Sequence, residues 1–227
     1  MSHINHIFFD LDHTLWDFET NSDIAFKTIF KQYKVQVNLD KFLNYYRDIN
    51  QQYWKMYREE RVSKEDLRYG RLRDTFNKIN FKIEDEIINN LAVDYINVLP
   101  NSNLLFEGAH EILAHLMPNY QLHIITNGFN EVQYQKMEKS DLTKYFKTII
   151  TSEDAGVKKP NPIIFEYALT QAKATSTESI MIGDNWEADI MGAKNAGFDV
   201  IFCNFNKESV ASNIKSVKNL IEIKQYL

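Results

Sequence analysis

Short apolar segments recur along the chain and alternate with longer amphipathic ones. Five of the short segments are rich in Ile, Val and Phe, which predicts β-strands over residues 4–9, 122–126, 148–151, 180–182 and 200–203. Helix-length segments lie between the later strands, over residues 109–117, 130–139, 162–173 and 186–196. This alternation predicts βαβ units. We therefore expect an α/β fold with a Rossmann-like parallel sheet and helices on both of its faces.

A long segment from residue 17 to residue 99 interrupts this alternation. It holds no clear strand, and its apolar residues, many of them aromatic, recur at helical spacing. Within it, Ser63 followed by Asp66 matches a capping box, which predicts the start of a helix. We expect residues 17–99 to form an all-helical insert, and residues 1–16 and 100–227 to form the α/β core together. For residues 207–227 we expect a surface turn and a final helix.

Composition narrows the class of protein. The net charge of −5 and the pI of about 5.7 predict no bulk attraction to nucleic acid polymers or to anionic membranes. The N-terminus lacks a basic region followed by a long apolar stretch, and no apolar run approaches the ~18 residues that span a bilayer. We therefore expect a cytoplasmic protein. Cys203 lies in an apolar run and is expected to be a small buried hydrophobe rather than a nucleophile.

Acidic residues follow the first predicted strand. Asp10, Asp12 and Thr14 form an Asp-x-Asp-x-Thr pattern directly after residues 4–9. Residues i and i+2 of an extended chain point to the same side, so both carboxylates can face one site at the carboxyl end of the strand, where open α/β sheets bind ligands. Two carboxylates this close repel each other unless a cation or a shared proton lies between them, and a hard cation such as Mg²⁺ prefers oxygen ligands. Alone, the pattern is equally compatible with a solvated turn.

Two later strands lead into hydroxyl, amide and lysine groups. Thr126, Asn127 and Gly128 end one strand, where a hydroxyl and the following backbone amides suit phosphate oxygens, although an ordinary turn can have the same residues. Lys159 lies just before two prolines and can present a cation to a phosphate. Lys158 is the competing candidate, and a solvent-facing loop lysine is the alternative for both.

The fourth predicted strand also ends in an acid. Gly183 and Asp184 follow residues 180–182, and Asp189 lies in the first turn of the next predicted helix, where interaction with the helix dipole is an alternative role. In a parallel sheet these strand ends converge on one edge. Together they supply a nucleophile, an acid/base, a hydroxyl, a cation and a metal ligand, which favours one catalytic site over four unrelated turns.

In this combination the chain resembles the haloacid dehalogenase (HAD) superfamily, whose motifs match Asp10 with Asp12, Thr126, Lys159 and Asp184 in order. The resemblance implies that Asp10 is a nucleophile that forms an aspartyl phosphate, and that Asp12 is the general acid and base. It also implies an Mg²⁺ ion held by Asp10, the backbone carbonyl of Asp12, and Asp184. Lys159 would screen the repulsion between phosphate and nucleophile.

The same resemblance implies roles around these residues. Thr126 and the amide of Asn127 would bind phosphoryl oxygens, and Asp189 would orient Lys159 or a metal-bound water. Residues 17–99 resemble the helical cap that members of the superfamily insert after the first motif. Dehalogenases of the superfamily lack the second aspartate, so the resemblance favours phosphoryl transfer.

A narrower resemblance concerns substrate. Residues 10–18 and the run that contains Tyr53, Trp54 and Arg71 are similar to the pyrimidine 5′-nucleotidase group. This implies that Trp54 stacks on a base and that Arg71 hydrogen-bonds the base or sugar. Packing within the helical insert is the alternative for Trp54. His13, at the variable position of the first motif, is expected to be a bystander.

The expected function is an Mg²⁺-dependent phosphatase, most specifically a 5′-nucleotidase for pyrimidine nucleoside monophosphates. A phosphatase for phosphoglycolate or a sugar phosphate, a phosphomutase, and a catalytically silent binding protein of the same fold are the alternatives. The intact set of Asp10, Asp12, Lys159 and Asp184 argues against the last of these. The expected partner is a small-molecule phosphate monoester, and the expected assembly is a monomer or homodimer.

Overall fold

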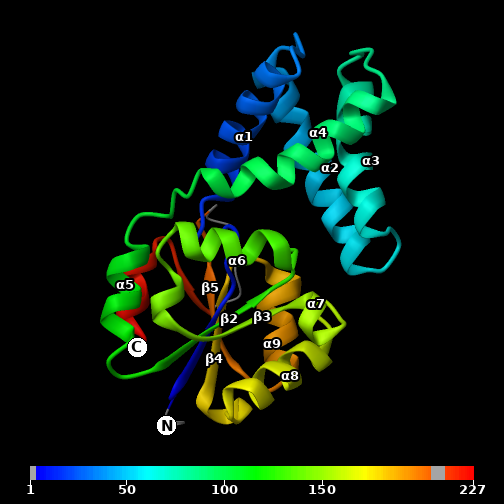
Figure 1. The fold of residues 1–227 in the computed structure, drawn as a ribbon. Helices are drawn as coiled ribbons and strands as arrows, with labels where there is room; N and C mark the ends of the chain where they lie inside the picture. The colour runs from blue at the N-terminus through cyan, green and yellow to red at the C-terminus, as the bar shows by residue number, and fades with distance from the viewer. Residues whose placement is uncertain (1–3, 206–212) are drawn as a thin grey trace. The chain divides into compact units, whose positions relative to one another are not determined.

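Two compact units make up the protein (Figure 1). The computed structural model describes residues 4–205 and 213–227. One unit, the core unit, combines Met1–Phe18 with Asn103–Leu227, and the other, the helical unit, is Glu19–Ser102. The helical insert was expected over residues 17–99, whereas the helical unit covers Glu19–Ser102.

A six-stranded sheet forms the centre of the core unit, with the strand order β3-β2-β1-β4-β5-β6. Every neighbouring pair of strands is parallel. The strands are β1 (His6–Phe9), β2 (Gln121–Thr126), β3 (Phe146–Thr151), β4 (Ser179–Gly183), β5 (Asp199–Cys203) and β6 (Lys215–Val217). The predicted α/β class with a parallel sheet is confirmed, and each predicted strand forms within a few residues of its expected bounds.

The end of the chain differs from the sequence prediction. Strand β6 pairs with β5 at the edge of the sheet, and only its last residue, Val217, is buried. So short a segment, with one buried side chain, lacks the apolar run by which strands are detected. The final helix is a 3₁₀ helix, η5 (Leu220–Gln225), and the turn predicted from residue 207 onward lies largely outside the described residues.

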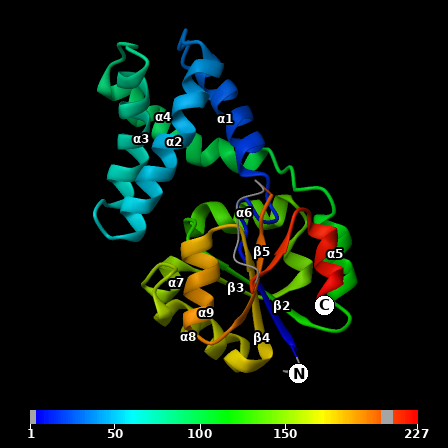
Figure 2. The ribbon, with the colours of Figure 1, turned by 180° about the vertical axis from the view of Figure 1, so that it is seen from behind.

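Helices cover both faces of the sheet (Figures 1 and 2). Helices α5 (Ala109–Leu116), α6 (Asn130–Lys139) and η5 lie on one face, and α8 (Pro162–Ala172) and α9 (Gly192–Asn195) lie on the other. The chain passes from β1 to β2 and on to β3 toward one edge of the sheet. After β3 it returns to β4 on the other side of β1 and continues to β5 toward the opposite edge. Because such crossovers are right-handed, the two sets of helices fall on opposite faces.

Shorter turns complete the core unit. They are α7 (Ser152–Ala155), η2 (Thr143–Tyr145), η3 (Ser176–Glu178) and η4 (Trp186–Met191). The helix predicted over residues 186–196 forms in two parts, because η4 is a π-helical turn and α9 continues from it. π-Helical turns are rare and occur frequently at functional sites, and η4 carries Asp189.

The face of the sheet beneath α8 and α9 is closely packed. The ring of Phe198 packs edge-on against Phe8 of β1, with centroids 5.4 Å apart, and against Phe165 of α8, at 5.7 Å. All three rings are buried, and burying each contributes roughly 1.5–3 kcal/mol. Met181 of β4 belongs to the same buried cluster, so the packing fixes both β1 and β4, whose carboxyl ends carry acidic residues.

The helical unit contains α1 (Phe18–Gln32), α2 (Leu39–Arg58), α3 (Lys64–Lys78), α4 (Asp85–Val98) and the 3₁₀ turn η1 (Leu99–Asn101). The insert is thus helical, as predicted. The capping box at the start of α3 is confirmed, since Asp66 N donates to Ser63 Oγ at 3.0 Å. The unit has its own aromatic core, in which Phe26 contacts Tyr46 at 4.5 Å and Tyr95 at 4.6 Å between ring centroids.

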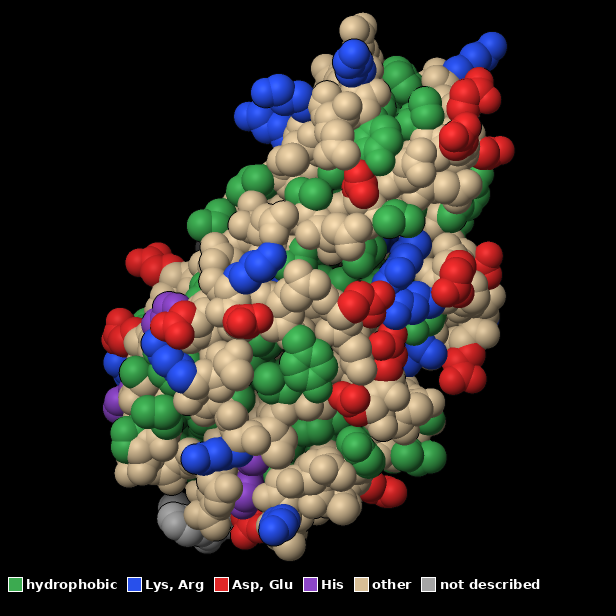
Figure 3. Space-filling model, in the orientation of Figure 1, with side chains coloured by type: hydrophobic (Ala, Val, Ile, Leu, Met, Phe, Trp, Pro, Cys, Tyr) green, Lys and Arg blue, Asp and Glu red, His purple; other side chains and the backbone are tan. Residues whose placement is uncertain are grey.

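Charged side chains are spread over both units. Acidic and basic groups are interspersed on the face shown in Figure 3. This distribution agrees with the modest net charge of −5. Among the residues that the structure describes, none of the helices is long and apolar enough to cross a membrane.

Candidate active site

The carboxyl ends of β1 and β4 lie next to each other at the centre of the sheet. The chain leaves β1 toward β2, and it reaches β4 from β3 on the far side of β1, so the strand order reverses here. Open α/β sheets bind ligands in the crevice at such a reversal. Asp10 follows β1 and Asp184 follows β4, and the amide of Asp10 donates to the Ile182 carbonyl at 2.9 Å.

Lys159 joins the acidic residues of this edge. Its ammonium nitrogen lies 2.6 Å from Oδ1 of Asp10 and 2.7 Å from Oδ1 of Asp189, and it donates to the Ile125 carbonyl at 2.6 Å. Lys159 is 1% exposed, so it is not a solvent-facing loop lysine. Between the two lysines that the sequence offered, the structure brings Lys159 into the carboxylate cluster.

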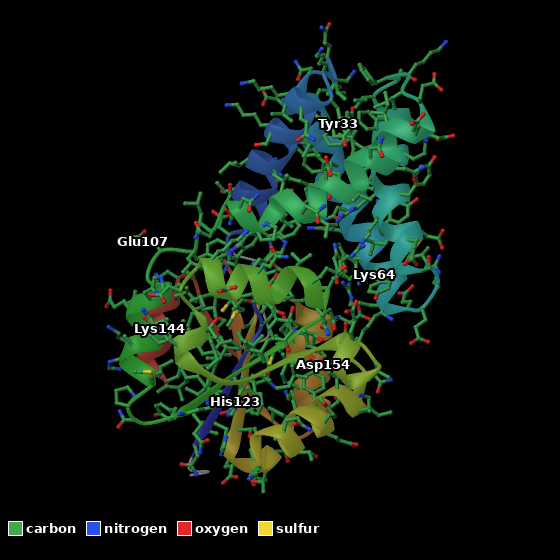
Figure 4. The ribbon with its side chains drawn as sticks, in the orientation of Figure 1. Tyr33, Lys64, Glu107, His123, Lys144 and Asp154 are labelled. Atoms are coloured by element: carbon green, nitrogen blue, oxygen red, sulfur yellow. The ribbon has the colours of Figure 1, made fainter. Side chains whose placement is uncertain are left out.

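Asn127 holds the backbone around Lys159. The amide of Lys159 donates to Oδ1 of Asn127 at 2.8 Å, and Nδ2 of Asn127 donates to the Lys159 carbonyl at 2.9 Å. The preceding loop starts from a second capping box, in which Thr151 accepts from the backbone of Asp154, labelled in Figure 4. The side chain of Asn127 therefore positions the lysine. The phosphate contact expected of its backbone amide stays a prediction.

Three carboxylates converge on one point. Asp10, Asp184 and Asp189 each present an oxygen, and these oxygens lie within 4.8 Å of one another. Thr14, the last residue of the first motif, donates to Oδ1 of Asp184 at 3.2 Å. The approach of Asp189 depends on Gly183, because a Cβ added there would lie 2.6 Å from the Cβ of Asp189. An all-oxygen donor set of this kind suits a hard divalent cation.

Electrostatics in the cluster also favours a cation. Burial, opposed by Lys159, raises the pKa of Asp10 well above its usual range. Burial and the neighbouring Asp189 raise the pKa of Asp184 to about 8. Burial disfavours the Lys159 ammonium, but Asp10 and Asp189 outweigh it and raise the pKa of Lys159. One lysine thus leaves the carboxylates undercompensated, and a bound cation would favour their ionised forms.

Asp12 has two partners that sequence reasoning missed. Nζ of Lys136 lies 2.6 Å from its Oδ1, and Nε2 of Gln133 donates to its Oδ2 at 3.0 Å. Gln133 also donates to Oγ1 of Thr126 at 2.8 Å. Gln133 and Lys136 lie one turn apart on α6 and both are buried. The sequence shows only that these two residues lie on one face of a helix, and this spacing does not indicate that they contact Asp12.

Thr126 is held in a defined orientation. Its Oγ1 accepts from Gln133 and from the amide of Gly128, the latter at 3.1 Å. A hydroxyl oxygen has two lone pairs, so its proton remains for an acceptor such as a phosphate oxygen. The phosphate contact expected of Thr126 stays a prediction.

Trp54 and Arg71 belong to the helical unit. Arg71 is 2% exposed and donates to Oδ1 of Asn50 at 2.8 Å, with its guanidinium 4.9 Å from the centroid of the Tyr95 ring. Trp54 is partly buried and packs edge-on against Tyr57, with ring centroids 5.8 Å apart. The substrate contacts expected of both residues stay predictions.

Cys203 and His13 lie outside the group of three converging carboxylates. Cys203 is 2% exposed, and burial raises the pKa of its thiol, which suits a small core residue rather than a nucleophile. His13 has a positive φ of 64° and its ring lies 5.0 Å from that of Phe18. Neither side chain contributes to the carboxylate cluster.

Known proteins resemble this chain along most of its length. Residues 7–203 match the family described as haloacid dehalogenase-like hydrolase. The pyrimidine 5′-nucleotidase YjjG of Escherichia coli is 32% identical over 228 residues, which cover 97% of this chain and 96% of that protein. The pyrimidine 5′-nucleotidase PynA of Streptococcus pneumoniae is 32% identical over 200 residues, which cover 87% of this chain and 83% of that protein.

The fold also occurs among solved structures. The crystal structure of the HAD-hydrolase YfnB from Bacillus subtilis, bound to magnesium, superposes with a TM-score of 0.87 at 24% identity. The match covers 98% of each chain. At this level of identity the similarity establishes the shared fold.

Proposed function

The chain belongs to the haloacid dehalogenase-like hydrolase family, and we propose that it hydrolyses pyrimidine nucleoside 5′-monophosphates through an aspartyl phosphate on Asp10. The observation that carries the proposal is the second carboxylate, Asp12. It lies two positions after Asp10 and is held at both oxygens by Lys136 and Gln133. A fixed second acid is what transfer from an oxygen ester to water requires.

The proposed hydrolysis has two steps, with Asp10 as nucleophile and Asp12 as acid and base. In the first step, an oxygen of Asp10 forms a bond to phosphorus while the bond from phosphorus to the ester oxygen breaks. Asp12, in its acid form, gives its proton to the departing oxygen. In the second step, water attacks phosphorus, the bond to Asp10 breaks, and Asp12 takes the proton from water. Alcohol and inorganic phosphate are the products, and both aspartates return to their starting forms.

Lys159 and Asp189 prepare the nucleophile. The ammonium of Lys159, at 2.6 Å from Asp10, orients that carboxylate and reduces its repulsion with a dianionic phosphate. Asp189, at 2.7 Å from the same ammonium, fixes the lysine in turn. Because Lys159 is buried, its charge acts with little screening by water.

Thr126 and Asn127 form the proposed phosphate-binding side. Both lone pairs of the Thr126 hydroxyl oxygen accept hydrogen bonds, from Gln133 and from Gly128. The hydroxyl proton is therefore left to be donated to a phosphate oxygen. The backbone amide of Asn127 supplies a further donor in the proposal. Thr126 is the last residue of β2 and Asn127 follows it, and β2 pairs directly with β1.

Mg²⁺ is the proposed metal. Asp10, Asp184 and the backbone carbonyl of Asp12 would hold it, and Asp189 lies close enough to contribute directly or through a water. When bound, the ion supplies positive charge that offsets the phosphate and the crowded carboxylates. The raised pKa values of Asp10 and Asp184 support this assignment, because they reflect charge that one lysine does not balance.

The pyrimidine nucleotide is the most specific part of the proposal. It is supported by two relatives, each 32% identical, whose names state this activity. We propose that Trp54 and Arg71 of the helical unit contribute to base and sugar recognition.

Phosphate release from a panel of esters tests the proposal. UMP, dUMP and dTMP would be compared with phosphoglycolate and a sugar phosphate, each with Mg²⁺ and with EDTA. We expect Mg²⁺-dependent release that favours the nucleotides and is abolished in Asp10→Asn. Asp141→Asn, which alters an exposed aspartate of the core unit, serves as the matched control.

The panel separates the parts of the proposal. Release from other esters only would keep the chemistry and reject the nucleotide. Release that continues undiminished in Asp10→Asn would reject the nucleophile. Absence of release from every ester by folded protein would reject the phosphatase and leave a binding protein of the same fold.

A further inference from the structure

Helix α6 presents two polar side chains to the proposed general acid. Lys136 contacts Oδ1 of Asp12 at 2.6 Å, and Gln133 contacts Oδ2 at 3.0 Å. Both residues lie more than 120 positions after Asp12 in the sequence. Each oxygen of one carboxylate therefore has its own donor, and both donors are on a single rigid helix.

The burial of Lys136 sets it apart from the other lysine of this helix. It is 2% exposed, whereas Lys139, one turn further, is exposed. Its ammonium lies 4.2 Å from the centroid of the Trp16 ring and 5.4 Å from that of Phe18. Lysine is rarely buried without a compensating partner, and here two aromatic faces and Asp12 supply the compensation.

Gln133 is oriented by the same carboxylate. Its Nε2 is shared between Asp12 and Thr126, while its Oε1 is buried with no hydrogen-bond partner among the described residues. Rotating the amide would set Oε1 against the carboxylate of Asp12, where two acceptors would repel. Leaving one buried carbonyl unpaired is costly, so the orientation indicates that contact with Asp12 dominates at this position.

A third contact links the two halves of the proposed site. Through Nε2, Gln133 connects Asp12 after β1 with Thr126 at the end of β2. A Cβ added to Gly128 would lie 2.8 Å from Cγ of Gln133, so the close approach of this side chain depends on glycine there. The Thr-Asn-Gly sequence thus makes room for the group that holds Asp12.

We propose that Lys136 and Gln133 are positioning residues for Asp12, and that Lys136 stabilises the negative charge that Asp12 acquires as it protonates the leaving group. This inference rests on the proposed function. When the ester oxygen departs, the Asp12 O–H bond breaks and its proton moves to that oxygen, so the carboxylate gains a full negative charge. A cation already fixed beside that carboxylate requires no rearrangement at this moment.

The role has a signature in the dependence on leaving group. A nucleoside alkoxide needs the proton of Asp12 in order to depart, whereas p-nitrophenolate is stable without one. Removing the support of Asp12 should therefore slow cleavage of an alkyl ester far more than cleavage of p-nitrophenyl phosphate. A defect in folding or in phosphate binding would slow both substrates alike.

The experiment measures kcat/KM for both substrates in Lys136→Met, Lys136→Arg and Gln133→Leu, using UMP or the best alkyl ester of the panel. We expect Lys136→Met to lower kcat/KM for the alkyl ester about 100-fold, and that for p-nitrophenyl phosphate less than about 5-fold. Lys136→Arg, which keeps the charge, should recover most of the loss. Gln133→Leu should lower the alkyl value about 10-fold.

Matched controls come from the same helix. Lys139→Met and Gln135→Leu change exposed residues of α6 to the same side chains and should leave both values unchanged within about twofold. Circular dichroism checks that each variant is folded. If Lys136→Met fails to fold, Lys136→Arg and Gln133→Leu still provide the comparison.

The outcomes distinguish this inference from the proposed function. A selective loss on the alkyl ester, recovered by arginine, supports the positioning role. Equal losses on both substrates, or no loss in the folded variants, overturn it while the phosphatase activity of the parent protein stands. Absence of activity in the parent protein rejects the proposed function instead.

Discussion

Nζ of Lys159 lies 2.6 Å from Oδ1 of Asp10, although 149 positions separate the two residues in the sequence. The contact joins the loop before α8 to the end of β1, and both residues are buried. It also reaches Asp189, so that one cation lies between two buried carboxylates. The chemistry proposed for this protein depends on that arrangement.

Replacing this lysine should remove activity while its neighbour tolerates the same change. Lys159→Met leaves Asp10 and Asp189 without their cation, and we expect kcat/KM to fall at least about 100-fold. Because breaking a buried ion pair costs about 3–5 kcal/mol, thermal unfolding should also occur at a lower temperature. Lys158→Met is the matched control and should stay within a few-fold of the parent protein. Equal effects of the two changes would reject the assignment of Lys159.

The stability of the metal-free protein should depend on pH through Asp184. Its pKa rises from 3.8 to about 8 on folding, so the folded state holds its proton more tightly than the unfolded state. This contribution to stability is fully present below about pH 4 and is lost as pH rises through about 8. Thermal unfolding in EDTA between pH 5 and pH 9, compared with Asp184→Asn, measures it.

In that comparison the parent protein should lose melting temperature with rising pH more steeply than Asp184→Asn. Saturating Mg²⁺ should flatten the slope of the parent protein, because a bound cation favours the ionised carboxylate. Parallel slopes for the two proteins in EDTA would contradict the assignment of the raised pKa to Asp184.

A second pH dependence should have the opposite sign. His123, labelled in Figure 4, lies inside the sheet, where it stacks against His6 and hydrogen-bonds Thr148 at 2.8 Å. Burial, with a smaller effect of His6, lowers the pKa of His123 to about 4. The neutral ring is therefore favoured in the folded state, and stability present above pH 6.5 is lost as pH falls toward 4.

The lowered pKa of His123 implies that the free energy of unfolding falls by about 3 kcal/mol once the pH is below that pKa. Urea unfolding at pH 7 and pH 5 measures it, and His123→Gln should show a smaller difference between the two. An unchanged difference in that variant would assign the acid sensitivity to other groups.

Gly183 should be required for the geometry of the acidic cluster. A Cβ in Gly183→Ala would lie 2.6 Å from the Cβ of Asp189, which must then move away from Lys159 and the other carboxylates. We expect Mg²⁺ affinity, measured by calorimetry, to weaken about 10–100-fold in a protein that still folds. Affinity equal to that of the parent protein would show that Asp189 does not contribute to the metal site.

The sequence was most informative at the strand ends. Asp10 and Asp184 directly follow buried strands of a parallel sheet and Thr126 is the last residue of another, so their convergence on one edge follows from the topology alone. Lys159 comes from a loop rather than a strand. Two adjacent lysines could not be separated, because the hydrogen bonds that Asn127 makes with the Lys159 backbone join residues 32 positions apart.

Other features depend on contacts that no local pattern encodes. Gln133 and Lys136 are polar residues on a helix, and only the packing of α6 on the face of the sheet brings them to Asp12. Strand β6 has one buried residue and forms because β5 offers an open edge. The burial of Arg71 among Tyr46 and Tyr95 likewise arises from the tertiary packing of α2, α3 and α4.

In the proposed mechanism, Asp10 carries the phosphoryl group during turnover. Protein mixed with UMP and Mg²⁺ would be quenched in acid within one turnover, digested and examined by mass spectrometry. We predict a phosphoryl group on the peptide that contains Asp10, at the side chain of that residue, and none in Asp10→Asn. Release of phosphate in the same experiment with Asp10 unmodified at every time point would show that Asp10 is not the nucleophile.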